Sequence, residues 1–253
     1  MLKIEHLYKK LGEFQIKDVN LEINDGEYFV ILGPSGTGKT IILDVIAGLI
    51  KPDDGKVIYN DIDYNKVLPE NRKVGFIYQD YLLFPHLNVK DNIIFGLKNM
   101  KFTKKQIDKK LIDICKMFNI EHLLYRKPKT LSGGEQQRIA IARALIRLPR
   151  IVLLDEPLSA LDPSTREKFM DILKRLNKET GAIFVHITHD FDEAKYLAHR
   201  IAIIKDGEVV QVGKPREIFE NPNSTFVTEF IGGGNKFKNN IEKNNFKIKV
   251  WGV

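Results

Sequence analysis

Eight consecutive residues carry the clearest chemistry in the chain. Residues 33–40 read Gly-Pro-Ser-Gly-Thr-Gly-Lys-Thr and match the pattern G-x-x-x-x-G-K-[ST]. Glycines let backbone N–H groups curl around an anion, and a helix that follows directs its positive end at the same anion. The pattern predicts a phosphate loop, with Lys39 on the β- and γ-phosphates of a nucleotide and Thr40 on Mg²⁺. We expect these residues to contact the phosphates: Gly33, Pro34, Ser35, Gly36, Thr37, Gly38, Lys39 and Thr40.

Two adjacent acids follow an apolar run later in the chain. Residues 151–154 read Ile-Val-Leu-Leu, and Asp155 and Glu156 come next. A buried strand that ends at Asp155 would hold this carboxylate at the sheet edge, where it can bind Mg²⁺ over the phosphate loop. Glu156 points in another direction and can orient or deprotonate a water in line with the γ-phosphate. Two acids that only cap a helix are the alternative, which the phosphate loop makes the weaker interpretation.

A second glycine turn reads Leu-Ser-Gly-Gly-Glu-Gln-Gln-Arg over residues 131–138. Ser132, Gly133 and Gly134 precede a helix that we expect to start near Glu135, so hydroxyl and N–H groups converge again on a negative ligand. This stretch reproduces the signature motif of ABC ATPases, and the chain resembles that family over roughly residues 1–231. We refer to Ser132–Gly134 as the signature turn.

Other landmarks of the family occur in the expected order. Gln79 resembles the Q-loop glutamine, Ser159–Asp162 resembles the D-loop, and His189 resembles the switch histidine within the switch loop Thr188–Asp190. The resemblance implies ATP and Mg²⁺ as cofactors, and Gln79 as a metal ligand beside Thr40 and Asp155. It also implies a catalytic set, which consists of Glu156, His189, Gln79 and Lys39.

The resemblance further implies an assembly. Two copies would pair head to tail as a homodimer, so that each ATP lies between the phosphate loop, Gln79 and Asp155 of one chain and Ser132, Gly133 and Gly134 of the other. The implied fold is α/β: a P-loop NTPase (RecA-like) core with an N-terminal antiparallel β-subdomain. An α-helical subdomain would be inserted at about residues 80–146.

The hydrophobic pattern of the sequence predicts the strands and helices that position these residues. Tyr28–Leu32 is a continuous apolar run, as in a strand buried on both faces, and leads into the phosphate loop. Lys39–Leu49 follows as a helix, whereas Leu2–Leu7 and Glu13–Ile23 are strands. Alternating strands and helices after Arg150 predict a mostly parallel sheet. The further strands are Lys56–Tyr59, Val74–Tyr78, Ile151–Leu154, Ile183–Ile187, Arg200–Ile204 and Glu208–Val212, and the further helices are Val89–Leu97, Lys104–Phe118, Glu135–Arg147, Ser164–Lys178, Phe191–Leu197, Pro215–Glu220 and Ser224–Phe230.

Length and composition restrict the possible domain size, cellular location and partners of the chain. The 253 residues, 43% of them hydrophobic, suffice for one sizeable α/β domain, and no apolar run approaches the roughly 18–20 residues that cross a bilayer. The N-terminus has no signal-peptide pattern, so we expect a chain at the cytoplasmic face of the cell membrane, peripherally bound. Cys115 is the single cysteine, which excludes an internal disulfide and is expected to be a buried packing residue. The net charge of +7 lies largely in short lysine runs, which we interpret as solvated surface rather than a nucleic-acid site.

The kind of transporter follows from further resemblance. The aromatic-rich segment 79–89 is similar to importer ATPases of prokaryotes, in which it docks a membrane permease, and an extracytoplasmic solute-binding protein delivers the solute. Residues 10–14 and 120–128 most resemble the molybdate/tungstate importers of archaea. Sulfate, other oxyanions, polyamines and sugars stay open as cargo, because cargo does not touch this subunit. A soluble ABC ATPase acting in translation or DNA repair is the alternative, and a catalytically dead interaction module is a third, which Lys39, Asp155, Glu156 and His189 argue against.

Two features depart from the family pattern or lie outside it. Leu11 occupies the place where many members carry an aromatic residue that stacks on adenine, so the base contact is open between Leu11, Tyr8 and Phe14. Because the residue that contacts the base is not determined, the sequence does not predict a preference for ATP over GTP. Residues 232–253 are rich in asparagine and lysine, and we expect a short flexible basic tail with no complete regulatory domain.

Overall fold

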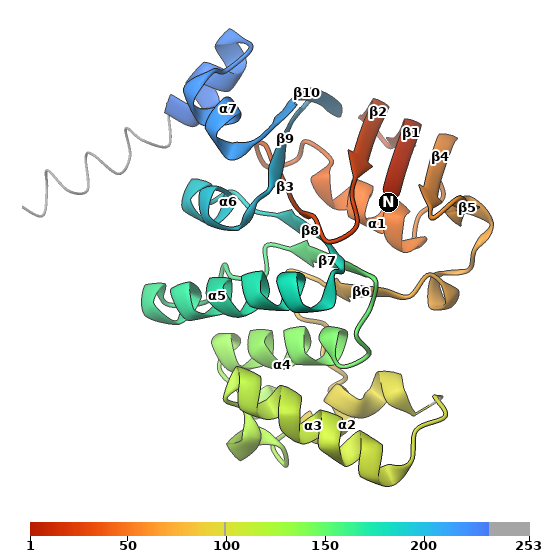
Figure 1. Cartoon of the computed structure of the whole chain (residues 1–253), viewed down its shortest axis with the longest axis vertical. Helices are drawn as coiled ribbons and strands as arrows, with labels where there is room; N and C mark the ends of the chain where they lie inside the picture. Colours follow the sequence, from red (N-terminus) through yellow and green to blue (C-terminus); the bar gives the residue numbers. More distant parts are fainter. Residues whose placement is uncertain (99, 233–253) are drawn as a thin grey trace, which may run out of the picture.

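Two β-sheets form the framework of the chain. The computed structural model describes residues 1–98 and 100–232 (Figure 1). The first sheet is antiparallel, in the order β2-β1-β4-β5, and consists of β1 (Leu2–Leu11), β2 (Phe14–Ile23), β4 (Asp54–Tyr59) and β5 (Ile62–Asp63). The second has the order β10-β9-β3-β8-β7-β6 and consists of β3 (Tyr28–Leu32), β6 (Val74–Ile77), β7 (Ile151–Asp155), β8 (Ile183–Ile187), β9 (Arg200–Lys205) and β10 (Glu208–Gly213). All neighbouring strands of the second sheet are parallel except β9 and β10. This architecture confirms the predicted α/β fold class.

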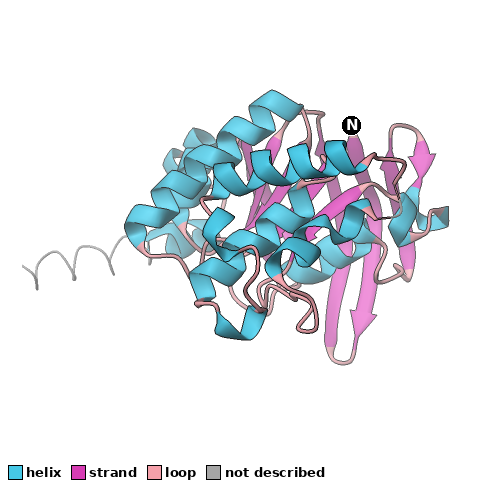
Figure 2. Ribbon diagram, turned by 90° about the horizontal axis from the view of Figure 1, so that it is seen from below, coloured by secondary structure: helices cyan, strands magenta, loops and turns pink. Residues whose placement is uncertain are grey.

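Helices fill the space between the sheets and cover the other face of the parallel sheet. Helix α1 (Lys39–Ala47) packs between the two sheets, where its apolar residues join those of both in one core. Helices α5 (Pro163–Thr180) and α6 (Phe191–Leu197) lie on the opposite face, with α7 (Pro215–Glu220) and a last helix at residues 225–232 beside β9 and β10 (Figure 1). Figure 2 shows helices packed closely against the strands. The phosphate loop therefore joins the central strand β3 to a helix that is buried on two sides.

The helical insertion forms the lower part of the molecule in Figure 1 and contains α2 (Val89–Ile94), α3 (Lys104–Phe118) and α4 (Gly133–Leu145). Helix α3 begins at a capping box between Thr103 and Gln106 and ends at Asn119, whose φ of 51° is left-handed. Its buried face includes Cys115 and Phe118, which join the core of the parallel sheet. The insertion is thus packed onto the core.

Several predicted boundaries were wrong. The helix after the signature turn starts at Gly133, two residues before the predicted Glu135, because Ser132 is its N-cap and shares a capping box with Glu135. It ends at Leu145 rather than Arg147, since Leu148 has a φ of 50° and Pro149 follows. Strand β5 was not predicted, because two residues carry no periodic signal. The predicted tail lies outside the described residues, apart from Gly232.

No described helix combines the length with the apolar character needed to cross a membrane.

Candidate active site

The phosphate loop has the backbone shape that its sequence predicts. It runs from the end of β3 at Leu32 to the start of α1 at Lys39, and Gly36 and Gly38 have φ of 78° and 88°. Only glycine adopts such angles without steric cost. A Cβ at Gly38 would also lie 2.5 Å from the side-chain ends of Ile16 and Phe14, so any other residue here would have to displace these two side chains. The ring of Phe14 therefore packs directly on the loop, whereas Leu11 is exposed at the hairpin end.

The ammonium group of Lys39 lies inside the loop. Its Nζ donates hydrogen bonds to the carbonyl oxygens of Gly33, at 2.9 Å, and Pro34, at 2.6 Å. Burial lowers the pKa of Lys39, while the nearby carboxylates of Glu156 and Asp155 act in the opposite direction. Lys39 thus places a positive charge at the centre of the phosphate loop, and its hydrogen bonds hold the side chain in that position.

A hydroxyl and a carboxylate meet where β7 ends. The Thr40 hydroxyl donates to Asp155 Oδ2 at 2.8 Å across 115 residues of sequence. Asp155 is 5% exposed, and burial raises the pKa of its carboxyl, which Glu156 raises further. Asp44, one helical turn after Thr40, also has a raised pKa, caused by burial and by Asp155. Sequence reasoning missed Asp44, although its i+4 spacing from Thr40 is a signal for the same helix face.

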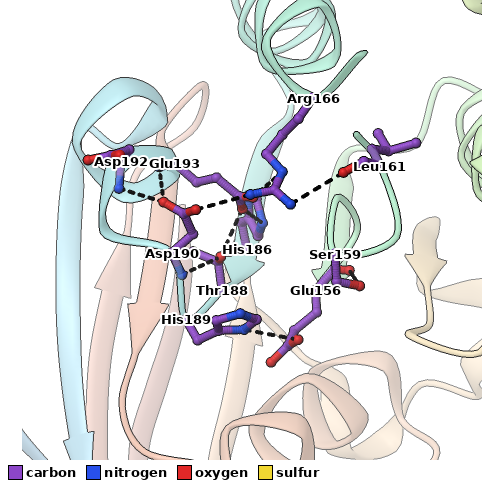
Figure 3. A network of polar contacts seen from close by, with 10 residues as sticks. All are labelled: Glu156, Ser159, Leu161, Arg166, His186, Thr188, His189, Asp190, Asp192 and Glu193. Carbon is purple, nitrogen blue, oxygen red and sulfur yellow. Dashed lines mark hydrogen bonds and ion pairs between the residues drawn. The ribbon is translucent and has the colours of Figure 1, made fainter. Parts of the chain in front are cut away.

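Glu156 and His189 come together from neighbouring strand ends. Glu156 Oε2 lies 3.1 Å from His189 Nδ1, and the Glu156 backbone N–H donates to the carbonyl of Ile187 at 3.0 Å (Figure 3). Glu156 has a φ of 47°, an uncommon conformation for a residue other than glycine. A cavity of about 40 Å³ beside both residues is large enough for a water molecule.

Polar residues behind His189 form a network that the sequence did not reveal. The Thr188 hydroxyl donates to Glu193 at 2.8 Å, and Arg166 of α5 reaches Asp190 at 3.2 Å (Figure 3). Burial raises the pKa of Glu193. Arg166 and Asp190 lie 24 residues apart, so no short motif could have paired them.

The remaining predicted site residues take two different positions. Gln79 follows β6, whose Ile77 pairs with Leu154 of β7, so it lies at the same sheet edge as Asp155 and is exposed. The signature turn begins α4 in the helical insertion, away from α1 (Figure 1). Within the described chain, no hydrogen bond or ion pair joins Ser132 to the phosphate loop. The structure thus gathers Lys39, Thr40, Asp155, Glu156 and His189, and leaves the signature turn apart.

The donor set fits a nucleoside triphosphate with Mg²⁺. The Thr40 hydroxyl and the Asp155 carboxylate are hard oxygen donors, which Mg²⁺ prefers, and they share one point at the start of α1. The loop adds a buried cation and a helix N-terminus, both of which favour the phosphate anion.

Comparisons with known proteins identify the family of the chain. A family model described as ABC transporter matches residues 16–159. The molybdate/tungstate import ATP-binding protein WtpC of Pyrococcus abyssi is 46% identical over 255 residues, which cover 99% of this chain and 74% of that protein. The spermidine/putrescine import ATP-binding protein PotA of Marinobacter nauticus is 43% identical, over 97% of this chain and 66% of that protein. A dimeric ATP-binding cassette solved in a post-hydrolysis state with ADP and Pi has 40% identity and a TM-score of 0.78, over 85% of this chain and 99% of that one.

Proposed function

The chain belongs to the ABC transporter family as an ATP-hydrolysing import subunit, and from that premise we propose that it energises the uptake of molybdate or tungstate. The observation that carries the cargo is the 46% identity to the Pyrococcus abyssi relative over 99% of the chain. Polyamine is the second candidate, supported by 43% identity to the Marinobacter nauticus relative. Cargo does not bind this subunit, so the choice depends on the permease that it drives.

We assign the site residues by the positions of their side chains. Lys39 would hold the β- and γ-phosphates within the loop, and Thr40 and Asp155 would hold Mg²⁺, with Gln79 at the same edge. When bound, Mg²⁺ would neutralise charge on the phosphate oxygens. Glu156 accepts a proton from the water that attacks the γ-phosphate, and ADP is the leaving group, since Glu156 lines with His189 a small cavity that is large enough for a water molecule. His189 holds the Glu156 carboxylate in place through its Nδ1.

We also propose that the active site is completed by a second copy, head to tail. Among the described residues, the signature turn has no hydrogen bond or ion pair to the phosphate loop of its own chain, and its helix N-terminus is suited to bind an anion. A dimer in which each signature turn faces the partner's phosphate loop uses both surfaces twice and closes with two-fold symmetry.

Mixing two inactive variants tests this pairing. Lys39→Ala removes the loop cation, and Ser132→Asp keeps an N-cap while it adds a negative charge toward phosphate. In a head-to-tail dimer, one of the two sites of the mixed pair combines an intact loop with an intact signature turn. We expect the mixture to recover up to about half of the activity per mixed dimer. No recovery in dimers shown to be mixed would refute the arrangement.

We propose that the segment after Gln79 and the insertion beside it dock the permease at the cytoplasmic face of the membrane. Leu82 and Phe95 expose about half of their side-chain surface, at 52% and 46%. Arg143 of α4 donates to the carbonyls of Tyr81 and Leu82, both of which have left-handed φ. A firmly held apolar surface of this kind suits an apolar partner helix. In this assignment residues 1–231 form the ATPase domain, with the insertion at about 80–146 as its permease-binding part.

Uptake in cells that lack the chain tests the cargo. We expect tungstate and molybdate accumulation, measured by elemental mass spectrometry, to fall and to return with the wild-type chain but not with Lys39→Ala. Radiolabelled putrescine uptake, measured in the same cells, should be unchanged. Lost putrescine uptake with normal oxyanion uptake would favour the polyamine candidate instead.

A further inference from the structure

The guanidinium group of Arg166 on α5 lies between two loops that the proposed site depends on. Its Nη1 donates to Asp190 Oδ2 at 3.2 Å, and its Nη2 donates to the carbonyl oxygen of Leu161 at 3.4 Å (Figure 3). Asp190 belongs to the switch loop and Leu161 to the D-loop. A single side chain thus connects two segments that are 29 residues apart in sequence (190 minus 161).

On the switch side, Asp190 determines where His189 lies. Its Oδ1 accepts hydrogen bonds from the backbone N–H groups of Asp192 and Glu193, which makes it the N-cap of α6. Its own backbone N–H donates to the Thr188 hydroxyl at 3.0 Å. The residues on both sides of His189 are therefore fixed, whereas the His189 side chain is 69% exposed and contacts the Glu156 carboxylate. A shift of Asp190 would carry the histidine with it.

On the D-loop side, Leu161 touches the signature turn. A Cβ built on Gly134 would lie 3.4 Å from Leu161 Cδ2, and one built on Gly133 would lie 3.9 Å from the Cβ of Ala160. The D-loop therefore packs against the start of α4. Arg166, which donates to the Leu161 carbonyl oxygen, therefore also stabilises the packing of the D-loop against α4.

The third nitrogen of the Arg166 guanidinium group, Nε, lacks a hydrogen-bond partner among the described residues. Arg166 Nε is buried and has no hydrogen-bond acceptor among the residues that the structure describes, although Glu193 Oε1 lies 3.8 Å away. A buried donor without an acceptor is costly, so a small movement of α6, which carries Glu193 and directly follows the switch loop, toward α5 would be favourable.

We propose that Arg166 is a positioning residue that keeps the switch loop in register with the D-loop, and so holds His189 at Glu156. This inference rests on the proposed roles of His189 and Glu156. The polar partners that the described residues give Arg166 are Asp190, Leu161 and Glu193, none of which belongs to the phosphate loop or the Thr40–Asp155 pair, so it acts on turnover and not on nucleotide affinity.

Steady-state ATP hydrolysis by the full-length chain tests the proposal. We expect Arg166→Gln to lower kcat on the order of tenfold or more with an unchanged KM for ATP, because small misplacements in a site cost up to about 10²-fold. The matched control is Arg175→Gln on the same helix, where an exposed pair with Glu179 is lost. In a His189→Ala background, Arg166→Gln should have little further effect, because the residue that it positions is gone.

Asp190→Asn provides an independent route if Arg166→Gln does not fold. Asparagine caps a helix as well as aspartate does, but it removes the charge that Arg166 holds. We expect the same loss of kcat at unchanged KM.

Three results would overturn the inference. They are equal kcat for Arg166→Gln and Arg175→Gln, a full additional loss in the His189→Ala background, and an effect confined to KM. An unsubstituted chain that hydrolyses no ATP would overturn the proposed function and this inference together.

Discussion

Glu156→Gln separates the chemical step from everything else that the site does. The amide has the shape of the carboxylate and can still accept a hydrogen bond from His189, so nucleotide binding should remain. It cannot take a proton from water. General-base catalysis contributes about 10²–10⁴-fold, which corresponds to about 2.7–5.4 kcal/mol of activation free energy. We expect kcat to fall at least about 100-fold and the ATP-bound dimer to accumulate.

The structure also limits the effect on stability. His189 is 69% exposed, and a pair of this kind contributes at most about 1 kcal/mol to the free energy of unfolding. The thermal midpoint should therefore move by no more than about 4 °C. The assay is phosphate release at saturating ATP, with Glu179→Gln as an exposed control, together with size-exclusion chromatography with and without ATP. Turnover within about threefold of wild type would refute the role of Glu156.

Three further perturbations address the loop and the core. Lys39→Ala should abolish ATP binding in a fluorescence titration, and tight binding would contradict the loop assignment, since the variant removes the cation within the curl. Gly38→Ala should lower the free energy of unfolding by about 2 kcal/mol or more, measured in urea, because φ is 88° and the new Cβ would lie 2.5 Å from two side chains. An unchanged midpoint would contradict this, since it would show that neither the positive φ nor the contact with Ile16 and Phe14 is costly. Burial lowers the pKa of His186 to about 3, from an ordinary value of 6.5. As the pH falls below about 6.5, His186 therefore takes up a proton in the unfolded chain but not in the folded one, and the free energy of unfolding decreases until the pH reaches about 3. Unfolding free energy should fall by about 2 kcal/mol more between pH 7 and pH 5 in wild type than in His186→Phe, and identical pH profiles would contradict this.

Much of the fold could be predicted because its central strands are buried on both faces. β3 and β8 have the predicted bounds, since their largely apolar runs mark where each strand begins and ends. Helix starts were less certain where a cap and a motif coincide. Ser132 caps α4 through Glu135, so the signature glycines lie within the first turn instead of before it.

The site residues also fall into those that the sequence could predict and those that it could not. Lys39, Thr40 and Asp155 could be found from local spacing, and their meeting follows from the order of the parallel strands. Arg166 and Glu193 could not, because their contacts depend on how α5 and α6 pack on one face of the sheet. Asp44 is intermediate, since its helical spacing from Thr40 was visible but its proximity to Asp155 was not.

The central claim is that this chain drives a membrane permease with ATP. Purification of tagged Glu156→Gln from native membranes with ATP, followed by mass spectrometry, tests it most directly, because the slow variant should retain the assembled state. We predict a polytopic permease in the eluate, absent when Lys39→Ala is the bait, and an oxyanion-binding protein beside it. Ribosomal or DNA-repair proteins with no permease would contradict the account.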